Sequence, residues 1–404
     1  MSSHYDVIIV GGGMVGATLA VALAEQSNIK VALVEAYQTA LIAENDQPEL
    51  RVSALTRASE MLLKNLNIWP QLIPNRISSF TDMKVWETAA SSLHFDSADI
   101  GEPLLGHIIE NRHLQQACLA RCRQIANIDF LCPAKPISRT GNTLVLEDGK
   151  VLTADLIVAA DGAQSHLREW AGIASQGWDY QQTAVVCTVT TELAHNKTAR
   201  QRFLPEGPLA FLPLADPHQC SIVWSNSTEE AELLCQLDDE RFKQVLSKAF
   251  ESTLGDITNV SRRASFPLKL SHADHYVDVG FALVGDAAHT IHPLAGQGVN
   301  IGLLDAATLA EIVLEAHGKG RNIGSLHTLN KYQRRRKADN LIMQLTMDAF
   351  KRVFGSDIAP IRWTRRFGLQ TVNKQGLLKK LFMSQAAGYR FANPTLTKHT
   401  ILGE

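Results

Sequence analysis

The chain has 404 residues, of which 45% are hydrophobic and 20% charged, and its formal net charge at pH 7 is −2. This length allows two or three lobes with a large core, and the near-neutral charge excludes the basic field expected of a nucleic-acid-binding protein. The N-terminal residues are polar and no apolar stretch reaches the roughly 18 residues of a membrane span, so we expect a cytoplasmic protein. The six cysteines show no zinc-type spacing, so we expect no metal site.

The first motif is a glycine-rich turn directly after an apolar strand pattern at residues 5–10. It matches G-x-G-x-x-G, a helix is expected at residues 15–26, and a second strand at 30–34 ends in an acid. In dinucleotide folds the three glycines serve a tight turn, the approach of a pyrophosphate and close helix packing, and the acid binds a ribose hydroxyl. The motif predicts a dinucleotide site formed by Gly11, Gly13, Met14, Val15, Gly16 and Glu35.

Two further segments, at residues 44–66 and 76–95, precede the second motif. Residues 44–56 are polar and contain Pro48, which predicts an extended loop, and a helix is expected at 56–66. Arg51 in this loop is either a cation close to the cofactor or one half of a surface ion pair. Strand-like residues at 76–95 are the first sign of a second lobe.

A buried strand pattern at residues 155–161 ends in Asp161-Gly162. An acid at the carboxyl end of a buried strand points to the cofactor crevice, although a simple Asp-Gly turn is the alternative. The texture of residues 183–267 is that of a β-rich substrate lobe, with a helical insertion at 228–254.

The segment from Phe281 to Asp305 holds a strand, a Gly285-Asp286 break, an irregular stretch and an apolar helix that starts after Gly296-Gln297-Gly298. Backbone N–H groups at such a helix start can bind an anion, although an ordinary connection would also explain the pattern. His289 and His292 could act on protons or could simply hydrogen-bond the loop.

The tail from Arg334 onward carries 14 Lys or Arg against 4 Asp or Glu. A solvated basic helix explains this asymmetry, and attachment to an anionic membrane surface is the sharper alternative.

Taken together, GGGMVG, DLIVAADGAQSHLR and GDAAHTIHPLAGQGVN resemble the three motifs of the FAD-dependent aromatic hydroxylases, the p-hydroxybenzoate hydroxylase-like family. The strings LRVSAL, LLGHIIENRHLQQA and GPLAFLPLADPHQCSIVWS are most similar to the ubiquinone-biosynthesis hydroxylases. The resemblance implies an α/β fold: a Rossmann-like FAD-binding domain, an inserted β-sheet substrate lobe and a C-terminal helical tail. The expected boundaries are 1–75, 101–182 and 268–320 for the FAD-binding domain, 76–100 and 183–267 for the substrate lobe, and 321–404 for the helical region.

The resemblance also implies roles for individual residues. The glycines of the first motif would hold the FAD pyrophosphate, and Glu35 the adenosine ribose. On the flavin side the family assigns Arg51 and Gln115. Asp161 and Gly162 belong to the motif that serves both FAD and the nicotinamide donor, and Asp286 would bind the ribityl and pyrophosphate region. The flavin ring would lie against Pro293, Gly296, Gln297, Gly298, Val299 and Asn300. Pro293 would lie near the reactive flavin edge, and His289 and His292 are the candidates for proton transfer. An apolar substrate pocket is expected from Phe203, Phe211, Leu212, Pro213, Leu214 and Trp224.

The activity that the resemblance implies is hydroxylation of a polyprenylated phenol or benzoquinol in ubiquinone biosynthesis. NAD(P)H would reduce FAD, and O2 would form the flavin C4a-hydroperoxide that transfers oxygen. We expect the C5 step, on a 2-polyprenylphenol, with a sister step at C6 or C1 or a non-catalytic FAD-binding scaffold as alternatives. Partners that the resemblance suggests are other ubiquinone-biosynthesis proteins. The basic tail suggests a further contact, with the inner face of the cytoplasmic membrane.

Overall fold

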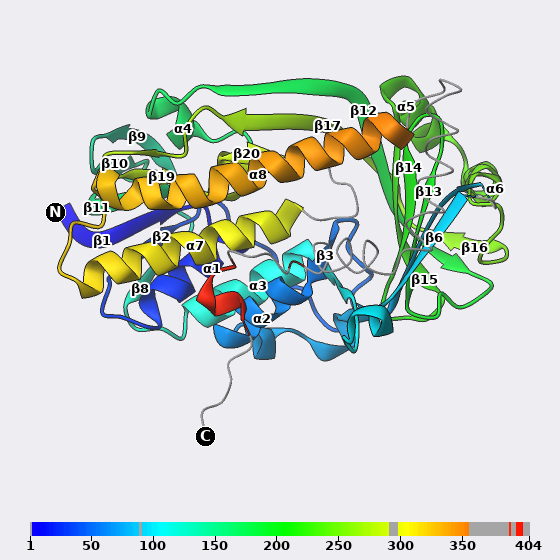
Figure 1. Ribbon diagram of the computed structural model, residues 1–404, viewed down its shortest axis with the longest axis horizontal. Helices are drawn as coiled ribbons and strands as arrows, with labels where there is room; N and C mark the ends of the chain where they lie inside the picture. The colour runs from blue at the N-terminus through cyan, green and yellow to red at the C-terminus, as the bar shows by residue number, and fades with distance from the viewer. Residues whose placement is uncertain (1, 89–90, 291–297, 355–387, 389–392, 399–404) are drawn as a thin grey trace.

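The structure is a computed structural model that describes residues 2–88, 91–290, 298–354, 388 and 393–398. It shows a helix-covered sheet at one end of the molecule and a second, larger sheet at the other (Figure 1). A third, small sheet of three strands packs against the second sheet. The site described below is built where these units meet.

The first sheet is mostly parallel. Its strands are β1 (Ser2–Val10), β2 (Val31–Val34), β8 (Ile128–Leu131), β9 (Pro136–Thr140), β10 (Thr143–Leu146), β11 (Val151–Ala159), β18 (Val277–Asp278) and β19 (Phe281–Leu283). The order is β18-β19-β11-β1-β2-β8, with β10 and β9 added as an antiparallel extension of β11. Since β2, β19 and the C-terminal halves of β1 and β11 are buried on both faces, their sequences read as continuous apolar runs.

Apart from the two helices that cover the second sheet, the described residues form six α-helices and several short 3-10 turns. The helices are α1 (Met14–Ala24), α2 (Arg57–Asn65), α3 (Asn111–Cys122), α4 (His166–Trp170), α7 (Gly298–Gly318) and α8 (Leu326–Phe354). The turns are η1 (Trp69–Gln71), η2 (Pro74–Arg76), η3 (Ser97–Ile100), η4 (Gly285–Ala287) and η6 (Thr395–Thr397). Helix α1 is buried all round because it packs against α3 and α7 as well as the sheet, and α8 lies along α7 and continues toward the second sheet (Figure 1).

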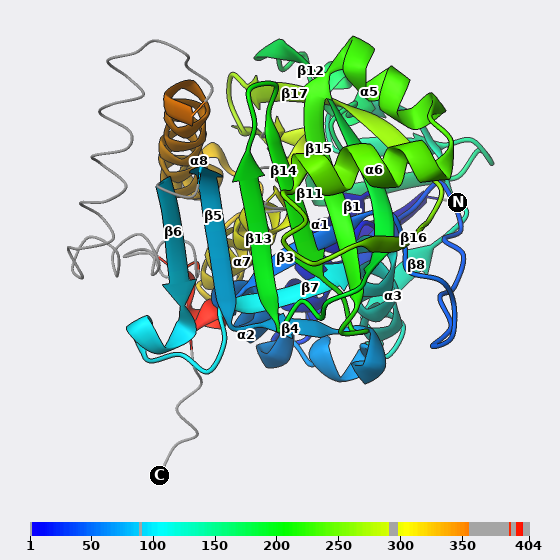
Figure 2. The ribbon, with the colours of Figure 1, turned by 90° about the vertical axis from the view of Figure 1, so that its right-hand side faces the viewer.

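The second sheet is mainly antiparallel. Its strands are β5 (Asp82–Thr88), β6 (Ser91–Asp96), β12 (Ser175–Thr191), β13 (Thr198–Phe203), β14 (Pro208–Pro213), β15 (Gln219–Ser227), β16 (Ile257–Val260), β17 (Ala264–Ala273) and β20 (His289–Thr290). The order is β20-β17-β12-β15-β14-β13-β5-β6, and β16 pairs with β12. Helices α5 (Thr228–Gln236) and α6 (Asp239–Ala249) cover its outer face (Figure 2). The long pair β12 and β17 joins this sheet to the first lobe.

The expectation of an extended loop at 44–56 is wrong at its C-terminal end. Residues Val52–Thr56 form strand β3, which pairs with β7 (Gly106–Glu110), and β7 pairs in turn with β4 (Ser78–Phe80). The pairing of β3 with β7 joins residues at least 50 positions apart, so local composition carries no signal for it. The small sheet packs its Phe80 and Ile108 against the inner face of the second sheet.

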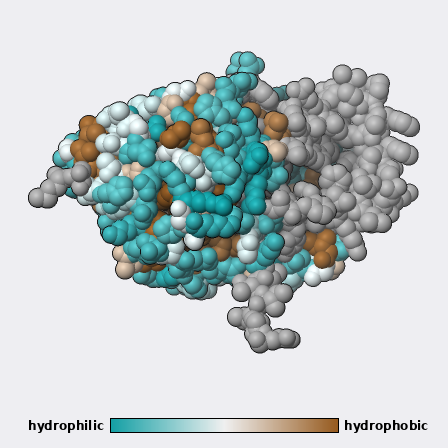
Figure 3. Space-filling model, turned by 60° about the vertical axis from the view of Figure 1, so that its left-hand side comes forward, coloured by the Kyte–Doolittle hydropathy of each residue, from teal (hydrophilic) through white to brown (hydrophobic). Residues whose placement is uncertain are grey.

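The predicted fold class is confirmed: an α/β molecule with a Rossmann-like sheet and a separate β-rich sheet inserted in the chain. The face shown in Figure 3 is mostly hydrophilic, with hydrophobic side chains in small separate patches, while the large apolar side chains fill the interior. Within the part of the chain that the structure describes, no helix is both long and apolar enough to cross a membrane.

Candidate active site

Three strand ends bring the sequence motifs together. Strands β1, β11 and β19 are adjacent and parallel, and their register aligns Val10 with Ala159 and Ala159 with Leu283. The residues that follow these positions therefore emerge at the same edge of the sheet: Gly11, Asp161 and Gly285. Ligands of open α/β sheets bind at this carboxyl edge.

Glycine is needed at the positions of the first motif for different physical reasons. Gly11 has φ +110°, and a Cβ there would lie 2.3 Å from the Ala160 oxygen; at Gly16 it would lie 2.0 Å from the Gly11 oxygen. Protein packing therefore requires both. At Gly13 a Cβ would have no atom within 4 Å, and the same holds at Gly298. Since protein contacts do not demand glycine at these two helix starts, they leave room for a bound group, and their N–H groups suit an anion.

Glu35 lies beside the first turn. Its Oε2 accepts a hydrogen bond of 2.7 Å from Gly12 N–H, and its Oε1 accepts one of 3.0 Å from Tyr37 N–H. Each carboxylate oxygen keeps acceptor capacity for a ribose hydroxyl. Gln115, which the resemblance placed on the flavin side, donates from Nε2 to the Gly12 oxygen at 2.9 Å and so braces the glycine turn.

Asp161 and Asp286 supply carboxylates at the same edge of the sheet. Together with Gly11 to Gly16, Glu35 and the start of α7 at Gly298, they form what we call the cofactor cradle. Asp161 Oδ2 accepts from Leu167 N–H at 3.3 Å, whereas its buried Oδ1 has no hydrogen-bond partner in good geometry among the described residues. Burial raises the pKa of this carboxyl, against the opposing effect of the Ser165 hydroxyl and Leu167 N–H. A buried carboxylate oxygen without a partner is what a cofactor hydroxyl would satisfy. Asp286 is accessible to solvent but surrounded by protein at longer range, and this desolvation raises its pKa against the pull of His289 and Arg51.

Two arginines connect the motifs. Arg168 is buried and donates to the Ala287 oxygen at 2.9 Å and the Ala163 oxygen at 3.1 Å, which ties the second motif to the third. Arg51 is exposed, and its guanidinium carbon lies 5.5 Å from the centroid of the Phe266 ring on β17. Arg51 thus spans from the cofactor lobe to the second sheet.

The third motif is only partly described. His292, Pro293, Gly296 and Gln297 lie outside the described residues, whereas Gly298 begins helix α7 and Val299 packs on the core. Asn300 is buried, and its Oδ1 accepts from Thr56 N–H at 3.0 Å and Ser59 Oγ at 2.7 Å. Its Nδ2 donates to the Ala54 oxygen at 2.8 Å. The side chain therefore braces β3 and α2, and the backbone of Asn300 and one remaining Nδ2 hydrogen are left to meet a flavin.

His289 and the half-buried residues of the first motif also have protein partners. The His289 ring is buried, with Nε2 2.5 Å from Asp305 Oδ2, so this nitrogen is committed to a carboxylate rather than to a substrate. Val15 packs against Gly285 and Gly302, and Met14 packs at the edge of the core. Gly162 has φ +87° and supplies the turn after Asp161.

The second sheet divides the expected substrate pocket between its two faces. Helices α5 and α6 cover the outer face (Figure 2), and Phe211 and Trp224 belong to the core beneath them. In this core Phe211 stacks on Phe250 at 3.6 Å between ring centroids. Leu212 and Leu214 belong to the opposite, inner core with Phe80. Side chains alternate along a strand, so the cross-strand pairs place Pro213 on the outer face and half-buried Phe203 on the inner face.

Comparison with known proteins agrees with this cradle. A family model described as "FAD binding domain" matches residues 138–345, more than half of the chain. Over 387 residues the chain is 38% identical to the 3-demethoxyubiquinol 3-hydroxylase of Escherichia coli (strain K12), which covers 95% of this chain and 98% of that protein. It is 39% identical over 388 residues to the ubiquinone hydroxylase UbiL of Rhodospirillum rubrum, covering 95% and 89%.

The chain belongs to the FAD-dependent ubiquinone-biosynthesis hydroxylases. The fold of the hydroxylase is also that of the p-nitrophenol 4-monooxygenase PnpA from Pseudomonas putida, with a TM-score of 0.78 at 18% identity, covering 97% of this chain and 100% of that one. The hydroxylase is thus a flavin-dependent aromatic monooxygenase whose cofactor is FAD, and NAD(P)H is the electron donor typical of the family.

Three residues of the hydroxylase site had no predicted role. Arg168 lies at the end of the second motif, Phe266 is an exposed aromatic residue within a β-strand, and Asp305 is an acid in the apolar first half of α7. A charged residue inside an otherwise apolar run is the signal that could have singled out Asp305, because such a residue is buried only when it is paired.

Proposed function

We propose that this hydroxylase inserts one oxygen atom of O2 into the ring of a polyprenylated phenol or quinol that lacks a carboxylate. The observation that carries the proposal is the character of the inner face of the second sheet. At the described inner-face positions of β12 to β15 the side chains are apolar or neutral, without a lysine or arginine. They include Ala184, Val186, Phe203, Ala210, Leu212, Val223 and Ser225.

A ring carboxylate placed against this face would be buried without a cation from the sheet, which costs several kcal/mol. Among the described residues Arg51 approaches the face, but it comes from the cofactor lobe, where its charge also lowers the pKa of Asp286. A neutral phenol with an apolar prenyl chain has no such requirement. The inner face therefore favours a decarboxylated ring over a benzoate.

The residues of the cradle bind and orient the cofactor. The N–H groups at the start of α1 suit the pyrophosphate of FAD, and those at the start of α7 suit its flavin ring. The Glu35 carboxylate suits the adenosine ribose, and the carboxylates of Asp161 and Asp286 suit hydroxyl groups of the ribityl chain of FAD. Bound FAD supplies the redox chemistry, namely acceptance of electrons from NAD(P)H and activation of O2. The apolar inner face and the small sheet exclude water from the substrate side.

Two ring positions are candidates. The strings in the β-lobe favour the C5 step on a 2-polyprenylphenol, whereas the E. coli relative is a 3-demethoxyubiquinol 3-hydroxylase, which favours a later step on a demethoxyquinol. Deleting the gene in a respiring host and identifying the accumulated precursor by mass distinguishes them. Accumulation of the polyprenylphenol supports the first, and accumulation of the demethoxyquinol supports the second. Unchanged quinone content would contradict both.

We also propose peripheral contact with an anionic membrane surface, because the prenylated substrate partitions into lipid and the tail from Arg334 onward is basic. Sedimentation with vesicles that contain anionic lipid tests it: binding should fall steeply as salt is raised, and equal binding to neutral vesicles would contradict it.

A further inference from the structure

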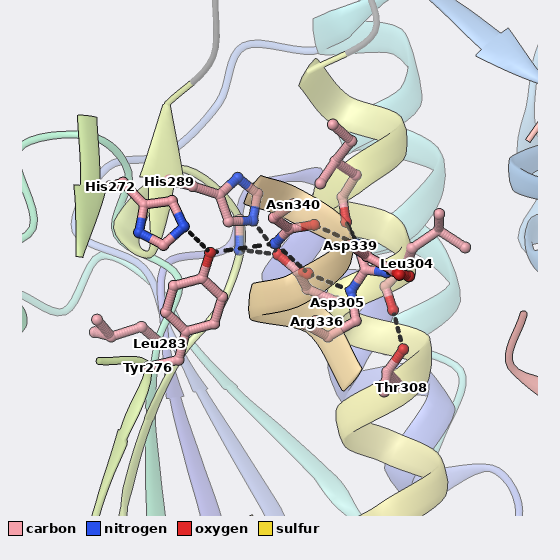
Figure 4. A network of polar contacts seen from close by, with 12 residues as sticks. His272, Tyr276, Leu283, His289, Leu304, Asp305, Thr308, Arg336, Asp339 and Asn340 are labelled. Atoms are coloured by element: carbon pink, nitrogen blue, oxygen red, sulfur yellow. Dashed lines mark hydrogen bonds and ion pairs between the residues drawn. The ribbon is translucent and has the colours of Figure 1, made fainter. Parts of the chain in front are cut away.

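A single buried carboxylate lies at the centre of a polar network between α7, α8 and the third motif (Figure 4). Asp305 is fully buried in the middle of α7. Its Oδ2 accepts from Gly285 N–H at 3.1 Å and lies 2.5 Å from His289 Nε2. Its Oδ1 accepts from Arg336 Nε at 2.7 Å and from Asn340 Nδ2 at 3.3 Å. All its acceptor capacity is therefore used inside the protein.

The two contacts of Oδ2 bracket one short turn. Gly285 starts the turn η4, and His289 follows it in β20. Asp286, the candidate cofactor ligand, lies between the two residues that Asp305 holds. Because the Asp305 carboxylate contacts both ends of the segment 285–289, it restricts where the Asp286 side chain can lie.

The contacts of Oδ1 connect the same carboxylate to α8. Arg336 is buried, and besides Asp305 it binds Asn340 Oδ1 at 2.8 Å and Asp339 at 3.2 Å. Burial alone would raise the pKa of Asp305, but His289 and Arg336 outweigh it and hold the pKa at about 2. The carboxylate therefore stays ionised, and an ionised acceptor makes stronger hydrogen bonds to the turn than a neutral one.

We propose that Asp305 is a positioning residue for Asp286: with His289 and Arg336 it fixes the turn 285–289, so that the docking of α8 determines how Asp286 meets FAD. The proposal rests on the proposed assignment of Asp286 as a cofactor ligand. It concerns binding of FAD by the folded protein, so it can be measured without turnover.

A double-mutant cycle tests this coupling. The Kd for FAD is measured by titrating apoprotein and following flavin fluorescence, with His289→Leu made in the wild type and in Asp286→Asn. We expect His289→Leu to raise Kd about tenfold in the wild type and less than about twofold in Asp286→Asn, because its effect acts through Asp286. His289→Gln, which keeps a donor to Asp305, should return Kd to within about threefold of wild type.

The matched control is Arg335→Gln, which removes the neighbouring arginine and its surface pair with Glu311 and should leave Kd unchanged. If His289→Leu does not fold, Arg336→Lys enters the same cycle. Equal losses in both backgrounds, or no loss in a folded variant, would overturn the coupling. If Asp286→Asn alone leaves Kd unchanged, the assignment of Asp286 fails first, and the proposal with it.

Discussion

Asn300→Ala should destabilise the hydroxylase far more than the loss of an ordinary surface amide. Asn300 is 4% exposed, and its side chain makes three hydrogen bonds, with Thr56 N–H, Ser59 Oγ and the Ala54 oxygen. Each such bond contributes roughly 1 kcal/mol net, and a buried group left without a partner costs more. The free energy of unfolding should therefore fall by about 3 kcal/mol.

Urea unfolding followed by circular dichroism measures this change, with Asn75→Ala as the control. Asn75 is exposed and makes a single side-chain bond to Glu44, so its loss should stay within about 0.5 kcal/mol. Asn300→Ala should also weaken FAD binding, because Arg51 directly precedes the strand that Asn300 braces. A loss below about 1 kcal/mol, or one equal to that of the control, would refute the reasoning.

Four further substitutions test other parts of the structure. Gly16→Val should yield protein without FAD absorbance, since even a Cβ there would lie 2.0 Å from the Gly11 oxygen; retained FAD would contradict this packing. Burial would raise the pKa of Glu60, but its basic neighbours hold it at about 2, below the usual 4.5. The stability that Glu60 contributes is therefore complete above pH 4.5 and lost as the pH falls toward 2, about 3 kcal/mol in all, and Glu60→Gln should flatten this part of the pH–stability curve. Val223→Phe on the inner face should raise KM with little loss of melting temperature, whereas Phe211→Ala should lower the melting temperature by an amount equivalent to about 3 kcal/mol; the reverse pattern would show that the faces are misassigned.

The cofactor cradle could be predicted because its signals are local. Gly11 to Gly16 and Glu35 follow one another within a single strand–turn–helix–strand unit. The rule that parallel strands present their carboxyl ends at one edge then brings Asp161 and Asp286 to the same place. The first step uses only residues that are close in sequence, and the second uses only a general rule of sheet topology.

The substrate side could not be predicted to the same degree. The run around Phe211 and Leu212 is apolar at successive positions because both faces of the sheet are buried, so the alternation that normally reveals a face is hidden. Trp224 and Phe211 were therefore grouped with Leu212, although α5 and α6 cover them. Only the pairing of distant strands separates the two sets.

Long-range polar contacts were also beyond the sequence. Asp305 and Arg336 are 31 residues apart on different helices, and Asn300 meets Thr56 across 244 positions. Arg336, Asn300 and Thr56 each read alone as a surface polar group, and the apolar run around Asp305 indicates burial without indicating its partners. What places them inside is the packing of α7 against β3 and α8, which no local pattern encodes.

Labelled oxygen tests the central claim most directly. The FAD-loaded hydroxylase is given NAD(P)H, O2 carrying heavy oxygen and a short-chain 2-prenylphenol or demethoxyquinol, and the product is analysed by mass. The account predicts that substrate stimulates NAD(P)H oxidation and that the product gains one heavy oxygen atom. NAD(P)H oxidation that ignores both substrates, with no labelled product, would contradict it.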